Sequence, residues 1–122
     1  MSRNRRYSMS RIADDKLVFL SGVFDAQQGT EKPFEEECRL AFESLRMGLK
    51  VANTEFSKVV HVNVHLKNLD DAIAMDEIWR SVFNEKRLPA RTVIVVKDLP
   101  IGVRIQLDVI ALKGFVREMN FY

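Results

Sequence analysis

The stretch at residues 88–111, LPARTVIVVKDLPIGVRIQLDVIA, contains two predicted strands and the turn between them. Residues 92–96 (TVIVV) are β-branched throughout, which predicts a strand that buries both of its faces. Residues 98–102 (DLPIG) contain the Pro and Gly that are typical of a turn. Residues 103–111 then alternate, with apolar side chains on one face and Arg104, Gln106 and Asp108 on the other, which predicts a last strand.

Two helices are predicted before this pair of strands. Pro33 begins the first helix, where a missing N–H costs nothing, and the glutamates at 35–37 suit the positive end of the helix dipole. Its apolar stripe recurs at helical spacing and consists of Phe34, Cys38, Ala41, Phe42, Leu45, Leu49 and Ala52. Asn68 is the predicted N-cap of the second helix. The apolar side of that helix consists of Ala72, Met75, Trp79, Val82 and Phe83.

Two further segments read as strand. Residues 16–22 (KLVFLSG) predict a strand that ends in Ser-Gly, and the polar connection at 23–32 has room for a short second strand. Residues 59–66 alternate, which predicts a strand with two different faces. The predicted faces are Val60, Val62, Val64 and Leu66 on one side and Val59, His61, Asn63 and His65 on the other.

The resulting element order is β(β)αβαββ, without a linker or repeat, and it predicts an α+β fold. Two helices on one face of a mixed sheet is the simplest way to bury both apolar stripes. The other face of the sheet is then left without a cover, and an oligomer that closes sheet against sheet would provide one. With 122 residues we expect a single domain over 1–122, with a basic segment at 1–10 and a C-terminal extension at 112–122.

Composition argues for a soluble protein with a weak overall field. The apolar fraction is 47%, and the net charge of +2 arises from 19 basic and 17 acidic residues. No apolar run approaches the roughly 20 residues needed to cross a bilayer. The basic residues cluster only at Arg3, Arg5, Arg6 and Arg11. That cluster fits a disordered or edge-strand segment, a mitochondrial presequence or a nucleic-acid arm; we expect the first, so a nucleic-acid partner is not expected.

Cysteine and histidine usage gives no sign of a metal or cofactor. Cys38 is the single cysteine, so no internal disulfide forms, and its place on the helical stripe indicates core packing. A cytoplasmic protein is expected, with the mitochondrion as the alternative. His61 and His65 lie on a predicted strand, where residues four apart are separated by about 13 Å, too far to share one metal ion.

Several segments resemble the Rid/YjgF family, including its RidA-like proteins. Residues 88–93 (LPARTV), the Leu-Pro at 99–100 and the strand at 103–111 are similar to the C-terminal signature of the family. Residues 18–22 (VFLSG) resemble its first strand and Ser-Gly turn, and residues 64–71 (VHLKNLDD) resemble its passage from strand to helix. The resemblance implies a chorismate-mutase-like fold of the bacillus type and a homotrimer with a central barrel, with pockets between neighbouring subunits.

The resemblance also implies a reaction, because many members hydrolyse 2-aminoacrylate and related imines to a 2-keto acid and ammonia. Arg91 matches the carboxylate-binding arginine of the family. A planar guanidinium holds a carboxylate by two parallel charge-assisted hydrogen bonds. The alternative for Arg91 is an ion pair with a neighbouring side chain. Ser21 and Gly22 match the family's Ser-Gly turn, and Tyr7 lies near the position of its pocket tyrosine, with Ser8 or Met9 as alternatives for that position.

Three positions depart from the family pattern. Gln106 lies where the deaminating members carry a glutamate, and an amide orients water without acting as a base. Asp108 shares its side of the strand and is an alternative base, though displaced by about 6–7 Å. Val93 replaces a common cysteine, and Asp76 replaces a common asparagine, which adds negative charge near an anionic substrate.

Three functions therefore remain open. The first is a deaminase of small 2-imino and enamino acids, supported by Arg91. The second is a catalytically weak ligand-binding or regulatory trimer, favoured by Val93, Gln106 and the apolar extension at 112–122, which we expect to pack on its own or a neighbouring subunit. The third is an RNA-directed activity, since some relatives are described as ribonucleases, but no cleavage constellation or aromatic platform is visible.

Overall fold

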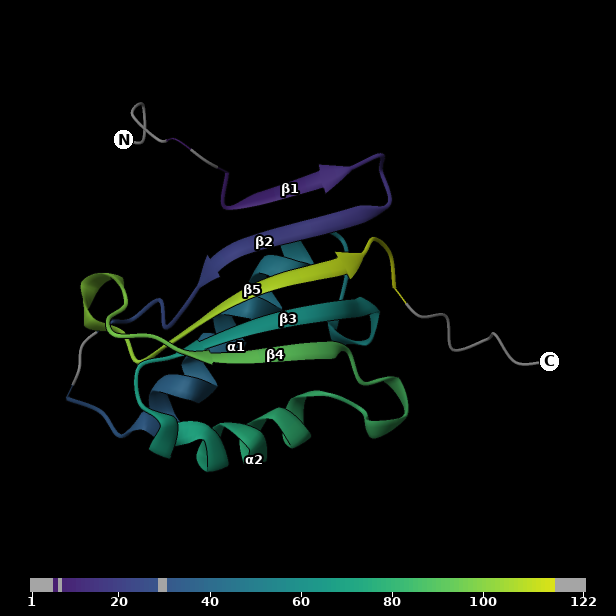
Figure 1. The fold of residues 1–122 in the computed structure, drawn as a ribbon. Coiled ribbons are helices and arrows are strands. Elements are labelled where there is room, and N and C mark those ends of the chain that lie inside the picture. The colour runs from purple at the N-terminus through teal and green to yellow at the C-terminus, as the bar shows by residue number, and fades with distance from the viewer. Residues whose placement is uncertain (1–5, 7, 29–30, 116–122) are drawn as a thin grey trace.

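The structure, a computed structural model, describes residues 6, 8–28 and 31–115. Its helices and strands, in chain order, are β1 (Ser10–Ala13), β2 (Leu17–Val23), α1 (Phe34–Val51), β3 (Val59–Leu66), α2 (Ala72–Val82), β4 (Ala90–Val95) and β5 (Ile105–Leu112). The strands form one sheet in the order β1-β2-β5-β3-β4 (Figure 1). β3 and β4 are parallel, whereas the other neighbouring pairs are antiparallel, so the predicted mixed α+β fold is confirmed.

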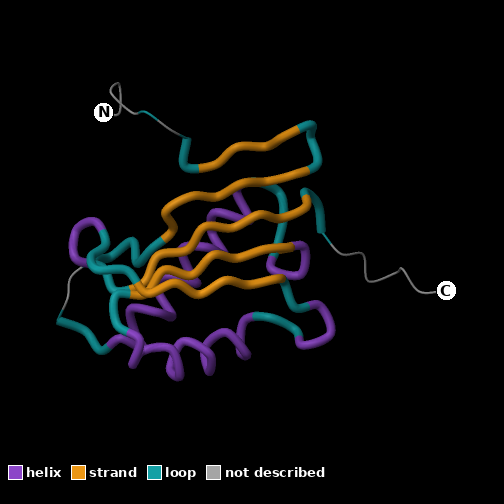
Figure 2. The backbone as a smooth tube through the Cα atoms, viewed as in Figure 1, coloured by secondary structure: helices purple, strands orange, loops and turns teal. Residues whose placement is uncertain are grey.

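The core lies between the sheet and its two helices. Figures 1 and 2 show α1 behind the sheet, with α2 running beside it. Every member of the predicted stripe on α1 is buried. In β5 the buried side chains are Ile105, Leu107, Val109 and Ala111, while the alternate ones are only partly covered. None of the described helices covers that second face, which we call the open face. No helix in the described part of the chain is both long and apolar enough to cross a membrane.

The additional strand of the sheet is β1, which precedes β2 in the chain. The prediction that it would follow β2, within residues 23–32, is wrong. Residues 24–28 and 31–33 form no strand, and β1 instead pairs with β2 from Ser10↔Leu20 to Ala13↔Leu17. Asp14 and Asp15 both have φ of 55°, a left-handed conformation that Asp tolerates in tight hairpin turns. This Asp-Asp turn joins β1 to β2, and the strand order places β1 at the edge of the sheet, as one interpretation of the basic segment allowed.

A bulge at the start of β3 changes the face of its first two residues. The pairing with β5 shifts register between Val59 and His61. Val59 is therefore buried at 4% exposure, whereas Val60 is 41% exposed, the reverse of the predicted alternation. From His61 to Leu66 the prediction is confirmed, because the side chains alternate between half-buried and buried.

β4 is the opposite edge of the sheet, and the prediction that this segment buries both faces is wrong for the single chain. The strand begins at Ala90, two residues before the predicted start, and Ile94 and Val95 are 44% and 45% exposed. An edge strand with such apolar side chains needs a cover. The predicted oligomer, which the single chain does not test, would supply it.

The starts of β5 and α2 also differ from the prediction. β5 begins at Ile105, because residues 100–102 form a 3₁₀ turn and Val103 follows it with extended backbone. Asn68 does not cap α2, because the 3₁₀ turn Leu69–Asp71 intervenes and Asp71 directly precedes the helix. Partial burial raises the pKa of Asp71, although a hydrogen bond from the Asn68 side chain opposes this shift.

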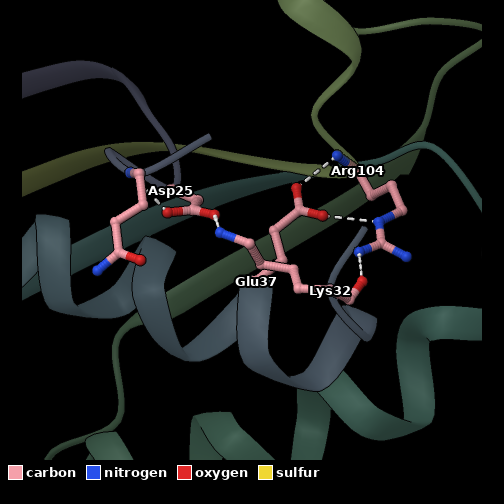
Figure 3. A network of polar contacts seen from close by, with 5 residues as sticks. Asp25, Lys32, Glu37 and Arg104 are labelled. Atoms are coloured by element: carbon pink, nitrogen blue, oxygen red, sulfur yellow. Dashed lines mark hydrogen bonds and ion pairs between the residues drawn. The ribbon is translucent and has the colours of Figure 1, made fainter. Parts of the chain in front are cut away.

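A network of buried charges holds the connection between β2 and α1 (Figure 3). The Glu37 carboxylate, 1% exposed, accepts hydrogen bonds from the backbone N of Arg104 at 2.7 Å and from its Nε at 2.6 Å. Arg104 Nη2 also donates to the Lys32 carbonyl oxygen at 2.6 Å. Lys32 Nζ forms an ion pair with the buried Asp25. These contacts tie the first turn of α1 to the chain just before β5.

Cys38 belongs to the core, as predicted. The thiol is buried, and burial together with the nearby Glu37 carboxylate raises its pKa to about 12. At neutral pH the side chain is therefore a protonated thiol. A nucleophilic cysteine needs an accessible thiolate, so the environment of Cys38 is that of a core residue.

Candidate functional site

Arg91 lies in β4 on the side of the sheet that faces the helices. Its partner in β3 is Val62, which is fully buried against the core. Arg91 Nη1 donates to Asp76 Oδ1 on α2 at 2.6 Å, and the guanidinium carbon lies 4.8 Å from the centre of the Trp79 ring. The predicted alternative, an ion pair with a neighbour, is therefore present. Asp76 and Trp79 are three residues apart on α2, so one face of the helix fixes the guanidinium from two directions.

A cleft of about 600 Å³ surrounds this pair, between α2, the turn Glu85–Arg87 and the start of β4. Its lining includes the aromatic rings of Trp79 and Phe83, the apolar Leu88, and the charged Asp76, Arg80 and Arg91. This volume suits a small molecule, and a lining that combines aromatic and apolar side chains with charged groups is typical of ligand sites.

A second group of predicted site residues surrounds the Ser-Gly turn at the end of β2. The register between β2 and β5 shifts between Leu20 and Val23, and Gly22 in this bulge has φ of +63°. The Gly22 backbone N donates to Asp108 Oδ1 at 2.7 Å. A Cβ on Gly22 would lie 3.4 Å from Gln106 Nε2, so the amide of Gln106 reaches this turn. Asp108 thus stabilises the bulge and, as predicted, shares the side of Gln106.

Arg91 and Gln106 lie on opposite faces of the sheet. Arg91 is in register with Val62, and Val62 with Val109, and both valines are buried under the helices. Gln106 pairs with His65, which lies three residues after Val62 in β3. Because side chains alternate along a strand, Gln106 points to the open face. Within one chain these two predicted site residues therefore form two separate groups.

The remaining candidates divide between the two groups. Val93 lies on the side of Arg91, since its partner Val64 is buried in the core. Ser21 belongs to the second group, where its backbone N donates to the Met9 carbonyl oxygen at 3.0 Å. Tyr7 lies outside the described residues, and its role as the pocket tyrosine stays a prediction.

Sequence reasoning placed Trp79 only in the core. The side chain is indeed buried, yet one face of its ring also supports Arg91. The signal that could have shown this was the spacing of Asp76 and Trp79, since residues three apart lie on the same face of a helix. Arg80, which lines the same cleft, gave no such signal in the sequence.

Fold and site together define an α+β protein whose surface has a cleft lined by charged and aromatic side chains. The sequence profile described as endoribonuclease L-PSP matches residues 2–113. The RutC family protein UK114 of Drosophila melanogaster is 34% identical over 114 residues, 90% of this chain and 81% of that protein. The 2-iminobutanoate/2-iminopropanoate deaminase of Rattus norvegicus is 34% identical over 112 residues, 88% of this chain and 80% of that protein.

The crystal structure of RidA from an Antarctic Psychrobacter species has the same fold. It superimposes with a TM-score of 0.80 at 24% identity, and the match covers 88% of each chain. The chain belongs to the Rid/YjgF family, which the profile describes as endoribonuclease L-PSP. Because several relatives at about 30–34% identity are named as imine deaminases, the family context is that of a Rid-type deaminase.

Proposed function

We propose that the protein hydrolyses small 2-imino and enamino acids to 2-keto acids and ammonia. The observation that carries this proposal is the arginine in the cleft, held by Asp76 and backed by the Trp79 ring. Arg91 Nη1 is engaged, but the guanidinium has further N–H donors that suit the carboxylate of a substrate. The names of the deaminase relatives support the choice of reaction.

We further propose that one site takes Arg91 from one copy of the chain and Gln106 from a neighbouring copy in a homotrimer. Two opposite faces of one sheet cannot line a single pocket, whereas an edge strand and the open face of a second copy can. Asp76, Val93 and Trp79 would lie with Arg91 in this arrangement. Gly22, Ser21 and Asp108 would lie with Gln106.

The chemistry requires little from the protein. Water adds its oxygen to the electrophilic imine carbon, the C–N bond then breaks, and both water protons leave with nitrogen as ammonia. Arg91 binds the carboxylate and thereby places the neighbouring C=N bond. The Gln106 amide orients the attacking water but takes no proton at neutral pH. Positioning alone therefore supplies most of the catalysis.

Arg91→Ala is expected to lower imine hydrolysis about 100-fold, because it removes the charge-assisted hydrogen bonds to the carboxylate. The measurement is release of ammonia and keto acid from an imine that an amino-acid oxidase generates. Arg87→Ala is the matched control, since it removes the same charge from an exposed side chain that does not line the cleft. An equal rate in both variants would move the site elsewhere.

Gln106→Glu is expected to raise the rate, by up to about 100-fold, because a carboxylate can act as a general base toward the water. The same assay measures it, and Gln28→Glu adds the same charge at an exposed position as a control. An unchanged rate in the Gln106 variant would place this residue outside the chemistry.

The second candidate function is a ligand-binding or regulatory trimer with weak catalysis. Two observations favour it: the Asp76 carboxylate already binds Arg91, and the Asp108 carboxylate already accepts a hydrogen bond from the Gly22 backbone N. A wild-type rate equal to the spontaneous background, across several imines, would establish this alternative. The cytoplasm remains our proposal for the compartment, consistent with a single buried thiol.

A further inference from the structure

The ion pair in the cleft leaves part of each partner available. Arg91 Nη1 and Asp76 Oδ1 bind each other, and their side chains are 29% and 41% exposed. In the part of the chain that the structure describes, Asp76 Oδ2 and Arg91 Nη2 and Nε have no hydrogen-bond partner. One acceptor on Asp76 and two donors on Arg91 therefore remain available in the same cleft. A ligand that meets both must carry a negative and a positive group close together.

A simple anion is a poor match for this pair. Its carboxylate would bind the free edge of Arg91 beside the Asp76 carboxylate, and like charges a few Å apart repel. The lining of the cleft holds two acidic residues, Asp76 and Glu85, and two basic ones, Arg80 and Arg91, so its charges balance and do not favour an anion. A 2-amino or 2-iminio carboxylate differs from an anion, because its N–H⁺ group is one carbon away from the carboxylate.

We propose that the Asp76–Arg91 pair makes the cleft selective for zwitterions, that is 2-amino and 2-iminio carboxylates, over the singly negative 2-keto acids. Arg91 holds the carboxylate, and Asp76 accepts a hydrogen bond from the charged nitrogen. This inference rests on the proposed function, since it assumes that Arg91 binds a carboxylate. In the proposed reaction the protonated imine is a zwitterion and the keto acid is not. The pair therefore favours substrate binding and product release.

Asp76→Asn is the decisive variant, because the amide oxygen can still accept from Arg91 while the negative charge is lost. Glu77→Gln is the matched control, since it makes the same change in charge one residue further along, at an exposed position. The probes are 2-aminobutyrate, a stable zwitterion, and 2-oxobutyrate, the corresponding keto acid. Binding is measured by calorimetry at constant pH and ionic strength, and circular dichroism confirms that both variants fold.

The wild type is expected to bind 2-aminobutyrate about tenfold or more tightly than 2-oxobutyrate. Asp76→Asn should weaken 2-aminobutyrate, strengthen 2-oxobutyrate and remove the preference, while Glu77→Gln keeps it. Equal binding of the two probes by the wild type, or an unchanged preference in Asp76→Asn, would overturn the inference. The proposed function would still stand in that case, provided that binding of the probes is lost in Arg91→Ala. If the wild type bound neither probe, both the selectivity inference and the proposed function would be contradicted.

Discussion

Replacing Glu37 with alanine is expected to lower the free energy of unfolding by about 3–5 kcal/mol, the range found when one partner of a buried ion pair is removed. The Glu37 carboxylate is 1% exposed and accepts two hydrogen bonds from Arg104. Without it, the Arg104 backbone N–H and part of its guanidinium lose their partners (Figure 3). Unpaired buried donors cost more than the net gain from the original bonds.

Urea unfolding followed by circular dichroism measures this effect. Glu36→Ala is the matched control, because it removes an exposed carboxylate from the same turn of α1 and should cost less than about 1 kcal/mol. The double variant Glu37→Ala, Arg104→Ala should cost less than the sum of the single changes, because the two residues act as a unit. If Glu37→Ala and Glu36→Ala were equally stable, the network would be a surface contact only.

The same network affects the second half of the proposed site. Arg104 directly precedes β5, and Gln106 is the second residue of that strand. Glu37 and the Lys32 carbonyl fix the chain immediately before Gln106, so the position of its amide depends on contacts with α1. Stability and site geometry are therefore linked through one buried carboxylate.

Much of the fold was predictable because it depends on periodicity. The stripe through Cys38 and Leu45 on α1 and the alternation in β5 each bury a continuous apolar surface. Such patterns can be recognised in the sequence without knowledge of tertiary contacts. The buried Glu37 was also visible in principle, since it lies three residues after Phe34 and four before Ala41 on the same stripe. The adjacent glutamates obscured it, because all three suit a helix N-terminus equally.

The missed features depend on contacts between distant residues. β1 has only four residues, and its place at the edge follows from pairing with β2. The bulge at Val59 follows from the register with β5. Asp76 and Arg91 were both candidates, but their direct contact spans 15 residues and requires the packing of α2 against β4. The separation of Arg91 from Gln106 likewise follows from strand order, which local patterns do not specify.

Mixing Arg91→Ala chains with Gln106→Ala chains is expected to restore activity that each variant lacks alone. If every site takes Arg91 from one copy and Gln106 from the next, each mixed trimer contains one intact combination. Random exchange at equal amounts would make about three quarters of the trimers mixed, so about one quarter of all sites would be intact. The prediction follows directly from the opposite faces of the two residues.

The experiment exchanges subunits by unfolding and refolding the mixture, and native mass spectrometry confirms that both variants share an oligomer. Arg91→Ala mixed with the double variant is the control, because no combination of these chains contains Arg91 and activity should stay absent. Mixed oligomers without any gain in imine hydrolysis would show that Arg91 and Gln106 do not serve one site. Full activity of Gln106→Ala alone would instead limit the site to the cleft of Arg91, within a single chain. A gain, by contrast, would require a shared pocket, because neither chain can supply both residues by itself.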